Sequence, residues 1–229
     1  MKKSAEHDVL AEEAGMSFNS HPDGWGYVIL ADEGRLYNYK SDKPIFEDDH
    51  ELPRIMGNMH AVFHARHAAE KRLIGPIFCG PYVETTEKEM MFLAHNGRVD
   101  MKRMGNDIGY DSSSSIDCEL MLKHAARFGI EKSMETLEKY TESALNVIIM
   151  TIGRESRDID MYFKNYYVNK SKKKYYDMYM GELHYGKAVF SSTLLSYGIS
   201  GEMVADSKIH LFSHAQGHSS RNGSAVSDT

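Results

Sequence analysis

The sequence is poor in cysteine and proline and has no long apolar segment. Its 229 residues include 2 cysteines, Cys79 and Cys118, and 5 prolines. Two distant cysteines provide neither a disulfide framework nor a CxxC metal motif, which fits a reducing cytoplasm. The longest nearly apolar run, residues 144–152, is shorter than the ~20 residues that span a bilayer. We therefore expect a cytoplasmic protein that makes no membrane contact.

The sequence also lacks an excess of positive charge and a secretion signal. Lys and Arg total 27 against 33 Asp and Glu, and the resulting net charge of −6 disfavours nucleic acid or anionic lipid as the main partner. Lys2 and Lys3 are followed by acidic residues rather than by an apolar stretch. With 41% apolar residues, the composition indicates a globular protein with a substantial core.

Local composition predicts an α+β fold in which strands dominate. Aromatic and β-branched residues predict strands over 25–31, 35–39, 61–66, 90–96, 145–152, 158–167, 175–180 and 187–191. Apolar spacing predicts helices over 5–14, 118–128 and 131–142, with Asp117 as the N-cap of the second. The basic run Lys170–Lys174 is expected at an exposed hairpin tip, with docking of a partner as the alternative.

Four short motifs occur in a fixed order along the chain. They are HPDGWGY at 21–27, HARHAA at 64–69, FLAHNG at 92–97, and the pair Asp117 and Glu119. Together they resemble the class II glutamine amidotransferases, a branch of the N-terminal-nucleophile hydrolases. The resemblance implies a four-layer αββα sandwich over residues 1–213, with the first strand of that fold missing here. The polar segment 214–229 is expected to be a disordered tail.

The resemblance assigns roles in glutamine hydrolysis to several of these residues. Arg66 matches the arginine that binds the α-carboxylate of glutamine, for which a planar guanidinium is well suited. Asp117 matches the carboxylate that binds the α-ammonium group. Asn96 and Gly97 match the oxyanion hole, which stabilises the negative charge that develops on the attacked amide. The ordinary alternatives are a surface ion pair for Arg66, a helix N-cap for Asp117 and an Asn-Gly turn for residues 96–97.

Further residues are expected to surround this site. His67 and, in a flap over the substrate, Pro81 and Tyr82 are assigned to substrate binding by the resemblance. Four more are expected to line the site in a mainly structural role, namely Asp23, Gly24, Trp25 and Gly26. Glu119 is interpreted as a first-turn acid that the helix dipole favours.

The family's nucleophile is a cysteine at the mature N-terminus, whose own α-amino group acts as the base. This sequence begins Met1-Lys2-Lys3-Ser4, so we expect the recorded start to lie downstream of the true one. Neither Cys79 nor Cys118 fits the nucleophile's place. The resemblance implies glutamine as substrate, no cofactor or metal, and a synthase domain or subunit that accepts the ammonia.

Two other functions remain open from the sequence. A non-catalytic glutamine-binding module would keep Arg66 and Asp117 and lack the nucleophile. A metal-dependent hydrolase could use His60, His64 and His67, with His95 nearby. However, a strand through 61–66 places His60 and His64 on one face and His67 on the other, which divides that cluster.

Overall fold

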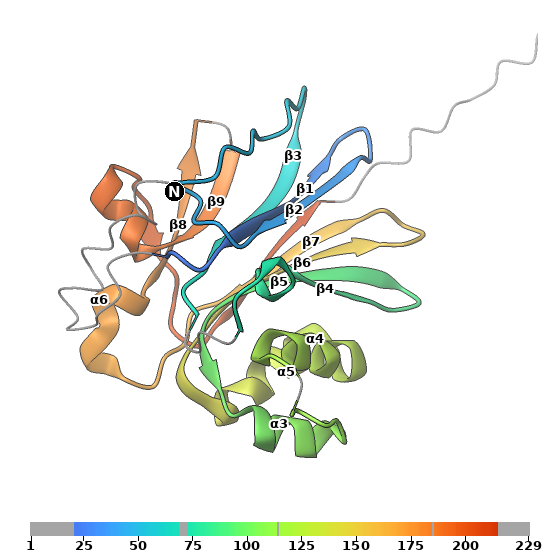
Figure 1. Ribbon diagram of the computed structural model, residues 1–229, viewed down its shortest axis with the longest axis vertical. Coiled ribbons are helices and arrows are strands. Elements are labelled where there is room, and N and C mark those ends of the chain that lie inside the picture. Colours follow the sequence, from blue (N-terminus) through green and yellow to red (C-terminus); the bar gives the residue numbers. More distant parts are fainter. Residues whose placement is uncertain (1–20, 69–72, 114, 185, 215–229) are drawn as a thin grey trace, which may run out of the picture.

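The computed structural model describes residues 21–68, 73–113, 115–184 and 186–214. Their strands form three antiparallel sheets, and the helices within residues 101–136 gather on one side of the largest (Figure 1). The helix predicted for residues 5–14 lies outside the described residues, as does the segment 215–229.

The first sheet contains three strands in the order β2-β1-β3. These strands are β1 Trp25–Ala31, β2 Leu36–Ser41 and β3 Met59–Ala65. A turn at Gly34, whose φ is 78°, returns the chain from β1 to β2. All three strands lie where their composition predicts them, within two residues at most ends.

The second sheet contains five strands in the order β11-β7-β6-β5-β4. These strands are β4 Tyr82–Thr85, β5 Glu89–Val99, β6 Thr141–Gly153, β7 Ile159–Lys164 and β11 Ile209–His214. The sequence predicts the centres of β5, β6 and β7, whereas β4 and β11 were missed. Strand β11 ends at His214, one residue beyond the predicted domain boundary.

Three helices cover one face of the second sheet (Figure 1). They are α3 Met101–Ile108, α4 Asp117–Phe128 and α5 Ile130–Thr136. Strand β5 alternates between two cores, because Met91 and Leu93 pack against the helices while Phe92 and Ala94 pack on the opposite side. Both faces of β5 are therefore packed within the hydrophobic core.

The first sheet packs against the second on the face opposite the helices. Val28 and Val62 meet Phe92 and Met150 between the sheets. The described chain thus has helix, sheet and sheet layers. The outer face of the first sheet packs against apolar residues of the segment 42–58, namely Ile45, Phe46 and Ile55. Antiparallel sheets with packed helices confirm the mixed class, but the fourth layer of the predicted αββα sandwich is not confirmed.

A small third sheet lies beside these layers. Its strands, in the order β10-β8-β9, are β8 Met178–Leu183, β9 Gly186–Ser191 and β10 Glu202–Met203. Met178 and Val204 pack on Phe163 of β7, which joins this sheet to the second.

Several predicted elements differ from those observed. The run Lys170–Lys174 is not a hairpin tip, because residues Lys170–Lys172 form a 3-10 turn and α6 spans Lys173–Tyr176. The strand expected at 175–180 therefore begins only at Met178. The helix expected over 131–142 ends as α5 at Thr136, and a 3-10 turn over Leu137–Tyr140 leads into β6. The helix α3 was missed because its mixed polar sequence contains Gly105.

Among the described residues, the longest helix is α4 with 12 residues, and none is long and apolar enough to cross a membrane.

Candidate functional site

The predicted site residues come from four elements that meet around the carboxyl end of β5. Arg66 directly follows β3, Tyr82 begins β4, Asn96 and Gly97 lie on β5, and Asp117 begins α4. The end of β3 is in contact with β5, since the ring of His64 shares a hydrogen bond with the backbone of His95.

The backbone of Arg66 continues the pairing between β1 and β3. Its amide donates to the Gly24 carbonyl at 2.9 Å, and the Asp23 amide donates to the Arg66 carbonyl at 3.2 Å. The guanidinium donates from Nη1 to the Leu73 carbonyl at 2.8 Å. Arg66 is therefore held by its backbone, while four of its five guanidinium N–H groups are not committed by that bond.

Asp23 fixes the turn that carries Arg66. Its buried carboxylate accepts a hydrogen bond from the Ala68 amide at 2.8 Å, and its Oδ2 lies 3.6 Å from Nδ1 of His67. Gly24 adopts a φ of 112°, and a side chain there would collide with Cys79 and with the Ser41 carbonyl. Asp23 and Gly24 thus have a structural role, because they hold the segments next to the start of β1 in place.

Trp25 and Gly26 lie on opposite faces of β1. The indole of Trp25 is 1% exposed in the outer aromatic cluster and donates to Asp48 at 2.8 Å. A side chain at Gly26 would instead meet the Gly80 carbonyl and the Tyr39 backbone. Gly26 therefore lets the segment before β4 approach β1, whereas Trp25 supports the strand from its other side.

Pro81 and Tyr82 are buried rather than part of an open loop. The peptide bond between Gly80 and Pro81 is cis, and the Tyr82 hydroxyl donates to the Phe78 carbonyl. Burial raises the pKa of that hydroxyl, and the Lys40 ammonium lies 5.0 Å from the centre of its ring. Part of the segment expected to be a flap is thus strand β4.

Asn96 and Gly97 form no hairpin turn, which removes the ordinary alternative for that pair. Both lie within β5, where Asn96 pairs with Asn146 and is exposed. Gly97 has a φ of 143°, and a side chain there would collide with the Ala144 carbonyl. The strand bulges immediately afterwards, between Gly97 and Val99.

Asp117 is the first residue of α4 and not its N-cap, which is Ile116. Its Oδ1 accepts from the Cys118 amide at 2.8 Å, while its Oδ2 lies 3.6 Å from Nδ1 of His95. The Asp117 side chain is 26% exposed. Glu119 lies in the first turn of the helix, as expected, and its carboxylate reaches the Ile116 amide at 3.5 Å.

The charges of Arg66 and Asp117 both act on two buried groups, the thiol of Cys118 and the hydroxyl of Tyr82. Burial chiefly raises the pKa of the Cys118 thiol, Asp117 raises it further, and Arg66 lowers it. The same opposite pair of charges acts on the Tyr82 hydroxyl. Arg66 and Asp117 therefore both lie within electrostatic range of Cys118 and Tyr82, on which their charges act oppositely.

Neither described cysteine is an activated thiol. Burial raises the pKa of Cys79 as well as that of Cys118, although Arg66 and Lys40 oppose this at Cys79. The thiolate is the nucleophilic form, so both side chains are unreactive in this state.

The histidines of the metal-hydrolase alternative do not come together as a ligand set. The His60 ring lies beside that of His214 in a tilted arrangement, with ring centres 5.1 Å apart, and His67 faces Asp23. The His64 ring has a buried Nδ1 without a hydrogen-bond partner among the described residues. Within the described chain, the side chains close enough to share a metal ion are His95, Asp117 and Cys118. Sequence reasoning missed this group, although His95 stands in the FLAHNG motif.

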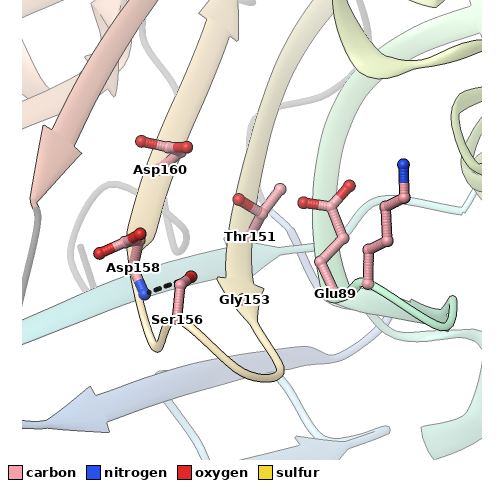
Figure 2. Close-up of a pocket in the computed structure, with 7 residues that line it drawn as sticks. Glu89, Thr151, Gly153, Ser156, Asp158 and Asp160 are labelled. Carbon is pink, nitrogen blue, oxygen red and sulfur yellow. Dashed lines mark hydrogen bonds between the residues drawn. The ribbon is translucent and has the colours of Figure 1, made fainter.

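The opposite end of β5 is open and acidic. A cavity of about 250 Å³ is lined by Lys88, Glu89, Thr151, Gly153, Ser156, Asp158 and Asp160. Figure 2 shows acidic side chains on the two strands that flank β6, Glu89 on β5 and Asp160 on β7. A second cavity, of about 430 Å³, also borders Glu89. Asn96 is seven residue steps along the strand from Glu89, a distance of about 23 Å.

No family model matches the chain, and no curated protein matches it either. Among solved structures, it is similar to the one titled the allosteric regulatory enzyme of purine biosynthesis, with a TM-score of 0.57 and 15% identity. The match covers 93% of this chain and 46% of the other, so the chain spans about half the length of that protein. That protein is a glutamine amidotransferase of the N-terminal-nucleophile hydrolase class, and the similarity establishes a relation of fold.

Proposed function

We propose that this chain is a glutamine amidotransferase-like domain that binds free glutamine at the carboxyl end of β5. One observation carries the proposal: Arg66 and Asp117 present opposite charges to the same buried groups, in a fold similar to that of a glutamine amidotransferase. A free amino acid is a zwitterion, and recognising it requires a cation and an anion in close proximity.

In the proposed complex, the Arg66 guanidinium binds the α-carboxylate of glutamine. Its rigid fork of donors matches the two carboxylate oxygens, and its backbone bonds to β1 hold it in place. Asp117 accepts hydrogen bonds from the α-ammonium group. Its Oδ2 is suited to this role, because Oδ1 is already occupied by the Cys118 amide.

The side-chain amide of glutamine then extends toward Asn96 and Gly97. In the proposed reaction, the Asn96 amide and the Gly97 N–H donate to the oxyanion that forms when the amide carbonyl is attacked. The exposed position of Asn96 in a strand, rather than in a flexible turn, supports this role, since preorganised donors stabilise an oxyanion best.

Binding and hydrolysis have separate requirements. Binding requires Arg66 and Asp117, whereas hydrolysis to glutamate and ammonia also requires a nucleophile, for which Cys79 and Cys118 are too buried. We therefore propose hydrolysis only for a form that carries a mature N-terminal cysteine. A glutamine-binding module without turnover is the second candidate, and the burial of both described cysteines favours it for the chain as printed.

Calorimetric titration of the full chain with glutamine tests the proposal. We expect saturable binding of glutamine, and loss of at least about 30-fold in affinity in Arg66→Ala, because truncating one partner of a close charge pair typically costs 2 kcal/mol or more. The matched control is Arg98→Ala, since Arg98 is 65% exposed and pairs with Glu142 at 2.7 Å.

The thermal unfolding midpoint of each variant must be measured alongside, because Arg66 also bonds to Leu73. A folded Arg66→Ala variant that binds glutamine as well as the unmodified chain would contradict the substrate assignment. So would equal losses of affinity in Arg66→Ala and Arg98→Ala.

A further inference from the structure

Three side chains that can each bind a metal ion lie close together where α4 meets β5. The Nδ1 atom of His95 lies 3.6 Å from Oδ2 of Asp117 and 3.9 Å from Sγ of Cys118. All three ligand atoms lie within 4.8 Å of one another. We propose that His95, Asp117 and Cys118 form a binding site for a zinc ion.

The distances from His95 to the other two ligand atoms suit a zinc site. Bonds from zinc to nitrogen, oxygen and sulfur are about 2.0–2.3 Å, which places ligand atoms of a tetrahedral site roughly 3.4–3.6 Å apart. The distances from His95 Nδ1 to Asp117 and Cys118, 3.6 and 3.9 Å, lie at or a few tenths of an ångström above these values, and all three atoms lie within 4.8 Å of one another. Small side-chain rotations would therefore close the three groups around the ion.

The orientation of the His95 ring supports the same use. Its Nε2 lies 3.2 Å from the Ala144 carbonyl, and a carbonyl can only accept, so Nε2 carries the proton. A neutral ring then leaves the lone pair of Nδ1 directed at Asp117 and Cys118. Hydrogen bonds of this kind orient and strengthen metal-binding histidines.

The mix of ligand atoms also favours zinc over other common divalent ions. Thiolate and imidazole select zinc and related transition metals, whereas calcium and magnesium prefer oxygen ligands alone. Cys118 and the His95 ring are buried, while the Asp117 side chain is 26% exposed. The ion would thus enter from the Asp117 side, where a water molecule can complete the tetrahedron.

Nearby charged residues both favour and disfavour the binding of a cation at this site. Asp117 and Glu119 attract a cation, whereas Arg66 and Lys40 repel it and at the same time favour the thiolate form of Cys118. The buried thiol would release its proton when the metal binds, so the affinity for zinc should rise with pH.

The shared use of Asp117 has a regulatory consequence, which rests on the proposed function. The oxygen that faces His95 is the one proposed to bind the α-ammonium group of glutamine. Zinc and glutamine should therefore exclude each other, and zinc should inhibit glutamine binding.

Cobalt(II) titration of the reduced full chain, freed of metal by a chelator, tests the site directly. A cobalt–thiolate bond gives a near-ultraviolet charge-transfer absorption, and this readout does not involve glutamine. We expect the absorption to saturate and to disappear when zinc is added. It should be lost in Cys118→Ser and kept in Cys79→Ser, since Cys79 is the other buried cysteine and lies outside the ligand group.

Asp117→Asn provides a second variant at a half-exposed position, with cysteine and histidine unchanged. It should weaken cobalt binding by more than about 100-fold, because losing a group that only orients a ligand already costs 10–100-fold. A chain without saturable absorption, or a folded Cys118→Ser variant with unchanged absorption, would overturn the site. If the absorption appears but glutamine does not displace cobalt, the zinc site is supported and the role of Asp117 in binding glutamine fails.

Discussion

At the carboxyl end of β5, a histidine, a cysteine and an aspartate are packed together and largely shielded from solvent, whereas at its amino end acidic side chains border an open cavity. His95 and Cys118 are buried beside Asp117, and the Arg66 charge reaches the same group. Glu89, Asp158 and Asp160 instead face a hollow of about 250 Å³. The comparison indicates that the cavity at the amino end is distinct from the residues that we propose to bind glutamine.

The largest difference is expected between two glycine-to-alanine substitutions, one at each end of β5. Gly97 lies at its carboxyl end, and Gly153 of β6 pairs with Glu89 at its amino end. Gly97→Ala should destabilise the protein by about 3 kcal/mol or more, because the residue has a φ of 143° and its Cβ would strike the Ala144 backbone. Gly153→Ala, next to the cavity, should cost less than about 1 kcal/mol, because the Ser156 side chain that it meets can rotate away. Urea unfolding of both variants measures this difference, and equal losses would contradict the packing described for Gly97.

His64 should make the buried end sensitive to acid. Burial lowers the pKa of His64 to about 3, and the nearby His21, His95 and Arg66 add to this. Because the folded pKa lies below the ordinary value of 6.5, the unfolded chain takes up the proton first, and stability is lost as pH falls from 6.5 toward 3. At pH 5 the loss from this residue is about 2 kcal/mol.

His64→Gln removes this titration. Urea unfolding at pH 7 and pH 5 should show that stability falls less steeply toward acid in the variant than in the unmodified chain. The same slope in both proteins would contradict the burial of the neutral His64 ring.

Substitution of Asp117 and of Asp160 compares the contributions of the two ends of β5 to glutamine binding. Asp117→Asn should weaken glutamine binding about tenfold, because it removes a charge-assisted hydrogen bond worth roughly 1.5 kcal/mol. Asp160→Asn, at the open cavity, should leave the affinity unchanged. Titration calorimetry measures both variants, and a larger loss in Asp160→Asn would move the proposed site to the cavity.

Glu89 should have the smallest effect on the stability of the fold. This effect should depend on pH in the direction opposite to that of His64. Burial raises the pKa of Glu89, and the charge of Asp160 adds to this. A carboxyl whose folded pKa is raised stabilises the fold when protonated, and this contribution is lost as pH rises through that pKa. Glu89→Gln should therefore be more stable than the unmodified chain at pH 7, by less than about 1 kcal/mol, and no more stable at pH 4. Thermal unfolding at the two pH values checks the sign.

The sequence predicts most of the fold's framework because its strands have distinctive compositions. Strands β1, β2 and β3 follow from aromatic and β-branched runs, and the start of α4 follows from its apolar spacing. The short edge strand β4 was missed because four residues carry little pattern, and the helix α3 was missed because Gly105 interrupts its amphipathic sequence. The hairpin expected at Lys170–Lys174 was wrong because the adjacent Tyr175 and Tyr176 are buried in a helical turn rather than in a strand.

The site was only partly accessible to sequence reasoning. The motifs directed attention to Arg66, Asn96 and Asp117, which lie on elements that meet around the end of β5, and their roles in binding stay predictions. They did not reveal that Cys118 meets His95, because the two residues are 23 positions apart and are joined only by the packing of α4 on β5. Such contacts depend on helix placement, which no local pattern specifies.

A crystal structure of the full chain with bound glutamine tests the central claim most directly. The proposed function predicts density for glutamine at the carboxyl end of β5, with its α-carboxylate on the Arg66 guanidinium and its α-ammonium group on Asp117. Glutamine bound at the Glu89 cavity, or in contact with neither Arg66 nor Asp117, would contradict it.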